Sequence, residues 1–267
     1  MRYKDHLNRT IALERQPRHI ISLVPSITEL LHDLGLEKRM AGITKFCVHP
    51  YHYQSTKNIV GGTKKVDIDL IKSLNPDLII CSKEENTPKI VKALEQFTQV
   101  FVTDINSFQE ALNFIIEIGE IVGKRIESQL MVEKINLKYH DFVKSIENTQ
   151  PVTSAYFIWK NPWMVAGSPT FINDMLKINR MQNIFADKGR YPEISIKHLK
   201  LQGNPEILLF SSEPYHFKED DAYEVLMENE NILSVFVDGQ YFSWYGSRLL
   251  KAFDYFKTIQ EKIADHE

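Results

Sequence analysis

The 267-residue chain has only two cysteines, Cys47 and Cys81, which is too few for a disulfide framework. Two buried free thiols are expected, and a single bridge between them is the alternative. No apolar run approaches the roughly 20 residues that cross a bilayer, so we expect no membrane span. The first residues also lack the apolar stretch of a signal peptide. Either the chain works in the cytosol or an export segment has been removed from it.

A basic surface and the common nucleotide motifs are also absent. The formal net charge is -3, which argues against nucleic acid as a partner because phosphate neutralisation needs clustered cations. The chain contains no Gly-x-Ser-x-Gly elbow, no Walker glycine loop and no Gly-x-Gly-x-x-Gly after a strand. The glycine-rich stretch Gly61-Gly62-Thr63-Lys64-Lys65 lacks the required spacing and is predicted to be a loop. These absences favour binding over catalysis.

What the sequence does contain is a regular alternation of short β-branched runs and helical patterns, typical of βα units around parallel sheets. An N-terminal α/β lobe is predicted over residues 1–106. In it a strand at 20–24 leads through Pro25-Ser26 into an apolar-periodic helix that ends at Gly35. Further strands are expected at 41–44, 78–81 and 100–102, and further helices at 67–74 and 90–97.

Residues 107–150 form a predicted helical segment with little glycine or proline. Apolar residues from Phe108 to Val122 keep a 4-3-4-3 spacing, which indicates a helix with one buried stripe. A second helix, from about 125 to 148, would be about 36 Å long at 1.5 Å per residue. That length is sufficient to cross one lobe and reach the next.

A C-terminal α/β lobe is predicted over residues 151–267. Strands are expected at 155–158, 207–210 and 233–237, and helices at 170–178, 194–201 and 247–264. Asn75-Pro76-Asp77 before one strand is echoed by Asn204-Pro205-Glu206 before another. The echo favours two related lobes, with chance as the alternative.

Aromatic residues gather in the segments that follow the predicted strands. Ligands of open parallel sheets bind beyond the carboxyl ends of the strands, and all three tryptophans of the chain lie in such segments. Aromatic walls suit a wide, flat, partly apolar ligand, although individual rings could instead cap a core. Arg248 is expected either to pair with a ligand anion or to tie a loop structurally. The candidate ring contacts are Phe46, Trp159, Trp163, Tyr215, Trp244 and Tyr245.

The tightest metal-like cluster in the sequence is Cys47-Val48-His49-Pro50-Tyr51-His52. Sulfur and two imidazoles this close suit zinc or copper, with a fourth ligand from elsewhere. The alternative for Cys47, His49 and His52 is an ordinary loop that carries histidines.

Three stretches together resemble the iron-siderophore and cobalamin solute-binding proteins of ABC importers. They are Arg18 to Leu31, Asp69 to Ile79, and Trp244-Tyr245-Gly246-Ser247-Arg248-Leu249. The resemblance implies two α/β lobes with parallel sheets flanked by helices, joined by one long backbone helix, with a ligand cleft between the lobes. It also implies that Phe46 and Tyr191 lie against the ligand.

The same resemblance implies docking on an ABC permease through an acidic residue on each lobe. These positions correspond to Asp69 and Lys197, so the second charge is reversed. The usual proline of the closing motif is Ser247, and the expected export signal is absent. Periplasmic location is implied by the resemblance, whereas the sequence as it stands is that of a cytoplasmic protein.

The resulting hypothesis is a monomeric solute-binding protein that captures a metal chelate, cobalamin or a ferric siderophore, for an ABC importer. No covalent cofactor is expected. A cytosolic carrier of corrinoids or metal chelates without a permease is the main alternative. An enzyme that uses Cys47 on the bound chelate is the third. Aromatic walls also suit haem, so the sequence does not identify the ligand.

Overall fold

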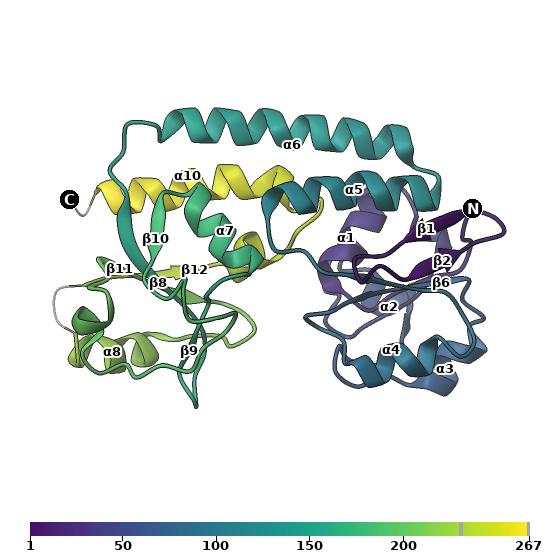
Figure 1. Ribbon diagram of the computed structural model, residues 1–267, viewed down its shortest axis with the longest axis horizontal. Coiled ribbons are helices and arrows are strands. Elements are labelled where there is room, and N and C mark those ends of the chain that lie inside the picture. The colour runs from purple at the N-terminus through teal and green to yellow at the C-terminus, as the bar shows by residue number, and fades with distance from the viewer. Residues whose placement is uncertain (230–231, 266–267) are drawn as a thin grey trace. The chain divides into compact units, whose positions relative to one another are not determined.

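The computed structural model describes residues 1–229 and 232–265, which fold into two compact units (Figure 1). The first unit comprises Met1–Ile105, Ala111–Glu133 and Tyr245–Arg248. The second comprises Asn106–Glu110, Lys134–Trp244 and Leu249–Glu267. Each contains a parallel sheet with helices packed on it, so the predicted α/β class is confirmed.

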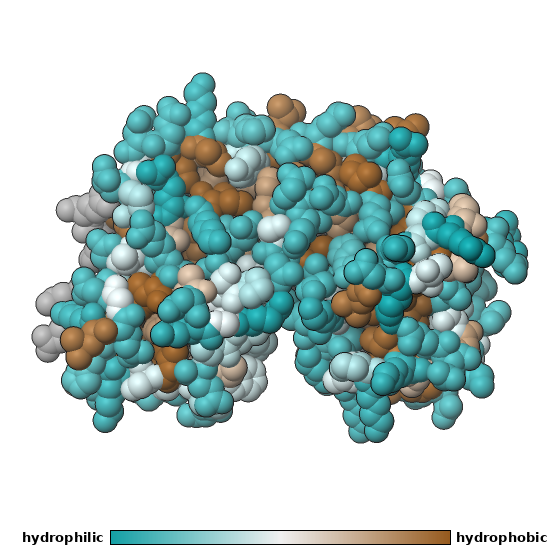
Figure 2. All heavy atoms as spheres, in the orientation of Figure 1, coloured by the Kyte–Doolittle hydropathy of each residue, from teal (hydrophilic) through white to brown (hydrophobic). Residues whose placement is uncertain are grey.

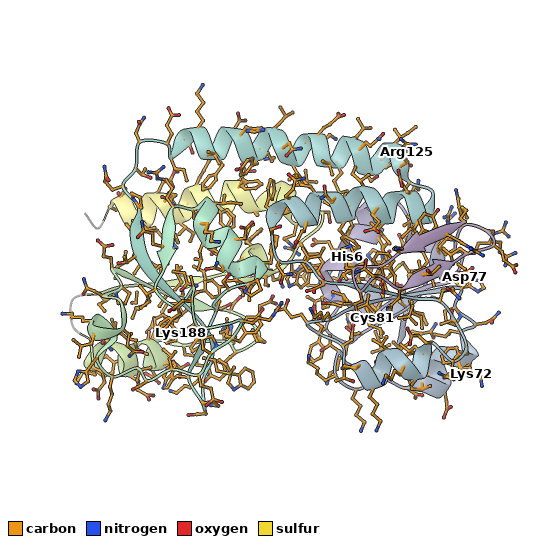
Figure 3. The ribbon with its side chains drawn as sticks, viewed as in Figure 1. His6, Lys72, Asp77, Cys81, Arg125 and Lys188 are labelled. Carbon is orange, nitrogen blue, oxygen red and sulfur yellow. The ribbon has the colours of Figure 1, made fainter. Side chains whose placement is uncertain are left out.

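The first unit is built on a five-stranded parallel sheet in the order β5-β4-β3-β6-β7. Its interior strands are continuous apolar runs, as expected for strands covered on both faces. In β6 all five residues are buried, including the free thiol Cys81 (Figure 3). The strands are β3 (Ile20–Ser22), β4 (Met40–Ile43), β5 (Asn58–Ile59), β6 (Leu78–Ser82) and β7 (Val100–Thr103).

Helices of the first unit begin at the residues that sequence chemistry favours. Pro25 opens α1 (Pro25–Asp33), Asp67 accepts a hydrogen bond from the backbone N–H of Leu70 to cap α3 (Ile68–Ser73), and Thr87 caps α4 (Pro88–Leu94). The first unit also contains two short helices, η1 (Glu37–Arg39) and α2 (Tyr53–Thr56). An antiparallel hairpin, β1 (Arg2–Lys4) and β2 (Thr10–Ala12), was not expected from the sequence.

The second unit has the order β10-β8-β11-β12, all parallel, with β9 antiparallel to β8. Its strands are β8 (Val152–Trp159), β9 (Met164–Val165), β10 (Met181–Asn183), β11 (Ile207–Ser211) and β12 (Leu233–Val237). Its helices are α7 (Phe171–Ile178), α8 (Glu219–Met227), α9 (Gly239–Ser243) and α10 (Leu249–Ala264).

The helix predicted at 194–201 is wrong. Only the 3₁₀ helix η2 (Leu199–Gln202) forms there. His198 adopts a left-handed backbone with φ of 56°, which an α-helix does not permit. The closing helix also starts at Leu249 rather than at 247, and the turn before it contains Gly246 with φ of 111°.

Along the sequence, two consecutive helices follow the last strand of the first sheet and precede the first strand of the second: α5 (Phe108–Val122) and α6 (Arg125–Ser145). Gly123, at φ of 73°, separates them. The boundary between the two units falls within α6, after Glu133. Hydrophobic surface is visible along α6 (Figure 2), where Ile126, Leu130 and Leu137 are exposed.

The two units share a backbone conformation just before a central strand, β6 in the first unit and β11 in the second. Asn75 and Asn204 both have positive φ, of 46° and 50°. In the first unit the Asp77 carboxylate then accepts hydrogen bonds from the backbone N–H groups of Arg18 and His19, just before β3. In the second, the Glu206 carboxylate accepts one from the N–H of Thr153 in β8. The sequence echo therefore corresponds to a shared local geometry.

Candidate ligand-binding surfaces

The strand orders locate a candidate binding surface in each unit. In open parallel sheets a ligand binds where the strand order reverses, beyond the carboxyl ends of the two strands involved. The reversal falls between β3 and β6 in the first unit and between β8 and β11 in the second. The relevant segments therefore follow Ser22 and Ser82 in the first unit, and Trp159 and Ser211 in the second.

In the second unit this position carries a connected layer of aromatic rings. Trp159, at the end of β8, is 39% exposed, and its ring meets Tyr215 edge-on at 5.8 Å between centroids. Tyr215 contacts the buried Phe217 at 4.8 Å, and Trp163 stacks on Phe217 at 6.0 Å with the planes 11° apart. We call Trp159, Trp163 and Tyr215 the aromatic rim. Buried rings behind the rim hold it in place.

A charged network supports the aromatic rim. The Lys160 ammonium lies 2.8 Å from a carboxylate oxygen of Asp221 and 2.7 Å from one of Glu224, and it sits 5.1 Å from the centre of the Trp163 ring. The hydrogen bonds that the Lys160 ammonium donates to these two carboxylates raise its pKa. Burial alone would raise the pKa of Asp221, but its bonds to Lys160 and to the N–H of Lys218 outweigh burial and lower it.

In the first unit, Phe46 follows β4 and is 49% exposed, with the Lys45 ammonium 5.1 Å from its ring centre. Gly62 lies directly beneath this ring, because a Cβ there would come within 3.2 Å of Phe46 Cε2. Arg248 is buried, and its Nε donates to the Glu29 carboxylate at 2.9 Å. Phe46 is therefore an exposed ring on the segment after β4, the strand next to β3, and Arg248 is tied structurally to α1.

The residues of the closing motif are mostly internal. Trp244 is buried, and its indole N–H donates to Glu213 at 2.7 Å. Tyr245 is buried, and its hydroxyl lies 3.0 Å from that of Thr103; burial raises its pKa. These side chains, like Arg248, hold loops of their units in position. A direct contact with solute remains a prediction for them.

The structure separates the predicted metal cluster. Cys47 is fully buried, with its Sγ 3.1 Å from the hydroxyl of Thr28 and 3.2 Å from that of Thr44. Burial raises the pKa of the thiol, which disfavours the thiolate that a metal needs. His52 instead lies with His32 and Glu37, a group that includes neither Cys47 nor His49.

Three further predicted residues have clear positions. Tyr191 is half-buried in the second unit beside the Arg190 guanidinium, 6.0 Å from the ring centre. Asp69 is exposed in the first turn of α3, and Lys197 is exposed just before η2. The supporting residues that sequence reasoning missed are Lys160, Glu213 and Asp221. Their partners are remote in the sequence, and for Asp221 the only local signal is the run of acids that opens α8.

Comparison with known proteins identifies the family. The family model described as "Periplasmic binding protein" matches residues 20–233, which is most of both units. The chain belongs to the periplasmic binding protein family.

Among curated members with similar sequences, this periplasmic binding protein is 25% identical over 214 residues to an uncharacterised ABC transporter substrate-binding lipoprotein of Bacillus subtilis. The match covers 77% of this chain and 67% of the relative. It is 23% identical over 197 residues to a vitamin B12-binding protein of Vibrio cholerae, covering 73% and 70% of the two chains.

Solved structures agree on the fold. The periplasmic vitamin B12-binding protein BtuF of Vibrio cholerae matches with a TM-score of 0.77 at 20% identity, over 94% of this chain and 99% of that one. The heme-binding protein RhuT of Roseiflexus matches with a TM-score of 0.76 at 17% identity, over 91% of this chain and 98% of that one.

Among the helices that the structure describes, none combines the length and the apolar character needed to cross a membrane.

Proposed function

We propose that this periplasmic binding protein captures a flat metal-centred macrocycle, of the corrinoid or heme class, for an ABC importer. The single observation that supports it most is the aromatic rim at the strand-order reversal of the second unit. The similar proteins named as vitamin B12-binding or heme-binding are consistent with that ligand class.

The shape of the rim suits a planar ligand. Trp159 and Tyr215 offer partly exposed rings, and Trp163 is held by its stack on Phe217 and by the ammonium of Lys160. Rings fixed in this way present area to a ligand with little entropy left to lose. Phe46 in the first unit offers a further exposed ring, which packs against Gly62. Tyr191 is the remaining ring that we include among the proposed contacts.

Two cations near the proposed surfaces, Lys160 and Arg248, are not available to a strongly anionic ferric siderophore. A strongly anionic ferric catecholate needs cations that are available to it. Lys160 is engaged by two carboxylates, and Arg248 by Glu29. The anion-binding capacity of these two cations is therefore already used within each unit.

Docking on the importer would use exposed charge on the first unit. Asp69 lies on the outward side of α3 with Asp67 capping the same helix. The Asp69 carboxylate is available to a basic residue of a permease. At position 197 of the second unit the exposed side chain is a lysine, which would not support the same contact.

The proposal is tested by equilibrium dialysis of the protein against cyanocobalamin, hemin and a ferric catecholate, with bound ligand read from its absorbance. We expect saturable binding of one of the two macrocycles. Trp159→Ala and Trp163→Ala should each weaken it about tenfold or more, which corresponds to roughly 1.4 kcal/mol.

Tyr223→Ala is the matched control, because Tyr223 is a well-exposed ring on α8 outside the rim. It should leave the affinity unchanged. Absence of binding by both macrocycles, or equal losses in the rim and control variants, would contradict the proposal. Preferential binding of the ferric catecholate would contradict the charge argument.

A further inference from the structure

A second cluster of ligating side chains lies in the first unit, outside the surface around Phe46. His32 is in the last turn of α1, Glu37 opens η1, and His52 immediately precedes α2. One ligand atom of each lies within 4.8 Å of the others. His52 Nε2 is 3.0 Å from a carboxylate oxygen of Glu37, and the two imidazole centroids are 5.7 Å apart. Three separate segments of the chain therefore converge at one point.

We propose that His32, Glu37 and His52 bind a divalent transition-metal ion, with Zn²⁺ the best match. Zinc takes imidazole nitrogen and carboxylate oxygen at about 2.0–2.2 Å, and two histidines with one glutamate is a known tetrahedral set that leaves one position for water. In such a site the ligand atoms lie about 3.4 Å from one another. The His52–Glu37 separation of 3.0 Å is close to that value, and all three ligand atoms lie within 4.8 Å of one another.

A buried tyrosine orients one of the histidines. The Tyr53 hydroxyl lies 3.0 Å from Nδ1 of His32, and Tyr53 is fully buried. When Nδ1 of His32 carries the proton, the phenol oxygen accepts a hydrogen bond from Nδ1–H. That hydrogen bond leaves Nε2 of His32 with its lone pair for the metal, which is how a supporting group fixes a metal-binding histidine.

The neighbouring charges partly balance one another. The Lys57 ammonium donates to the backbone carbonyl of Glu37 at 2.5 Å and lies 5.2 Å from the centre of the Tyr53 ring. It anchors η1 and α2 together but opposes a cation. Asp33, next to His32 in the sequence, adds a negative charge nearby. Among Lys57, Asp33 and Glu37, the two carboxylates outnumber the one ammonium, whereas Lys38 and Arg39 follow Glu37 in η1.

An ordinary surface hydrogen bond is the simpler interpretation of this cluster. It accounts for His52 and Glu37, whose side chains are each 47% exposed and would gain little from such a bond. It does not account for the placement of His32, held by a buried phenol and within ligating distance of the same two groups. Metal binding explains all three positions and would fasten residues 49–53 to the end of α1.

The test is calorimetric titration of the tag-free protein with ZnCl₂. One Zn²⁺ per chain is expected, with a rise in the thermal unfolding temperature because only the folded chain assembles the site. His52→Ala and Glu37→Gln should each weaken binding at least tenfold. Tyr53→Phe, which keeps the ring and removes the hydroxyl, should weaken it about tenfold.

His140→Ala is the matched control, because His140 is an exposed histidine on α6 remote in sequence from the site. It should leave zinc binding unchanged. Circular dichroism of each variant without metal separates a lost site from a lost fold. No zinc binding, or binding that persists in His52→Ala, overturns the proposal. Because the macrocycle assay uses other residues, its failure and that of the zinc assay are distinguishable.

Discussion

At the scale of single residues, the aromatic rim depends on charges beneath it. Asp221 serves two partners at once: its carboxylate binds the Lys160 ammonium and accepts the backbone N–H of Lys218 at the start of α8. Both contacts are largely shielded from water, since the Lys160 and Asp221 side chains are only 16% and 9% exposed. Loss of this carboxylate would leave Lys160 without its most buried partner.

We therefore expect Asp221→Asn to lower the free energy of unfolding by about 1–3 kcal/mol at pH 7. Because folding lowers the pKa of Asp221, its contribution is present above the unfolded pKa near 3.9 and is lost as pH falls through the lower folded value. Urea unfolding at pH 7 and at steps towards pH 3 measures this. The difference from wild type should shrink on acidification.

Glu224→Gln is the control for this residue, since Glu224 binds the same ammonium but its side chain is 50% exposed. Its effect should stay below about 1 kcal/mol. Equal effects of the two substitutions would show that burial does not decide the strength of this network.

At the scale of helices and strands, periodicity predicted most of the fold. The strands at β3, β6, β11 and β12 and the helices α1, α5, α6 and α7 were expected because each carries a strong apolar run or stripe. Helix α8 was missed because it buries only Asp221, Ala222 and Val225 in its nine residues. The helix expected at 194–201 failed because its backbone turns left-handed at His198.

The candidate site was predictable only in part, because a sequence pattern shows neighbours along the chain but not partners that folding brings together. Aromatic residues after strands mark a surface by their position in the sequence, as for Trp159 and Phe46. The side chains that hold such residues in place cannot be found from sequence position, because the members of a pair such as Glu29–Arg248 are 219 residues apart. The zinc candidate shows this too: His52 was grouped with its sequence neighbours, whereas folding places it with His32.

Helix α6 gives a prediction at this scale, because its first part belongs to the first unit and its second part to the second. Its buried stripe includes Met131, Ile135 and Phe142, while Lys134 is exposed at the boundary. We expect Lys134→Pro to cost about 3 kcal/mol and to uncouple the unfolding of the units. Lys134→Ala, which favours helix, should not.

All three tryptophans lie in the second unit, so fluorescence reports that unit and circular dichroism reports both. The two urea transitions should coincide in wild type and in Lys134→Ala, and should separate in Lys134→Pro. Coincident transitions in the proline variant would mean that α6 does not couple the units.

At the scale of the whole molecule, the proposed function requires a contact with an importer, and surface charge is the feature that would select that partner. The net charge of -3 is small, so long-range steering depends on where charges are placed rather than on their sum. Asp69 and Lys197, exposed on different units, carry opposite signs. If both positions meet basic residues of a permease, one contact attracts and the other repels.

This arrangement predicts opposite effects for two charge reversals. Asp69→Lys should weaken association with a reconstituted importer of the bound solute on the order of tenfold, about 1.4 kcal/mol, mostly through a slower on-rate. Lys197→Glu should strengthen it, and both effects should diminish as salt is raised because exposed charges are screened. Glu14→Lys makes the same charge change at another exposed position of the first unit. Surface plasmon resonance with the importer in nanodiscs measures the association and dissociation rates. Equal weakening by Asp69→Lys and Glu14→Lys would show that the net charge of the protein governs docking, rather than the position of Asp69 on α3.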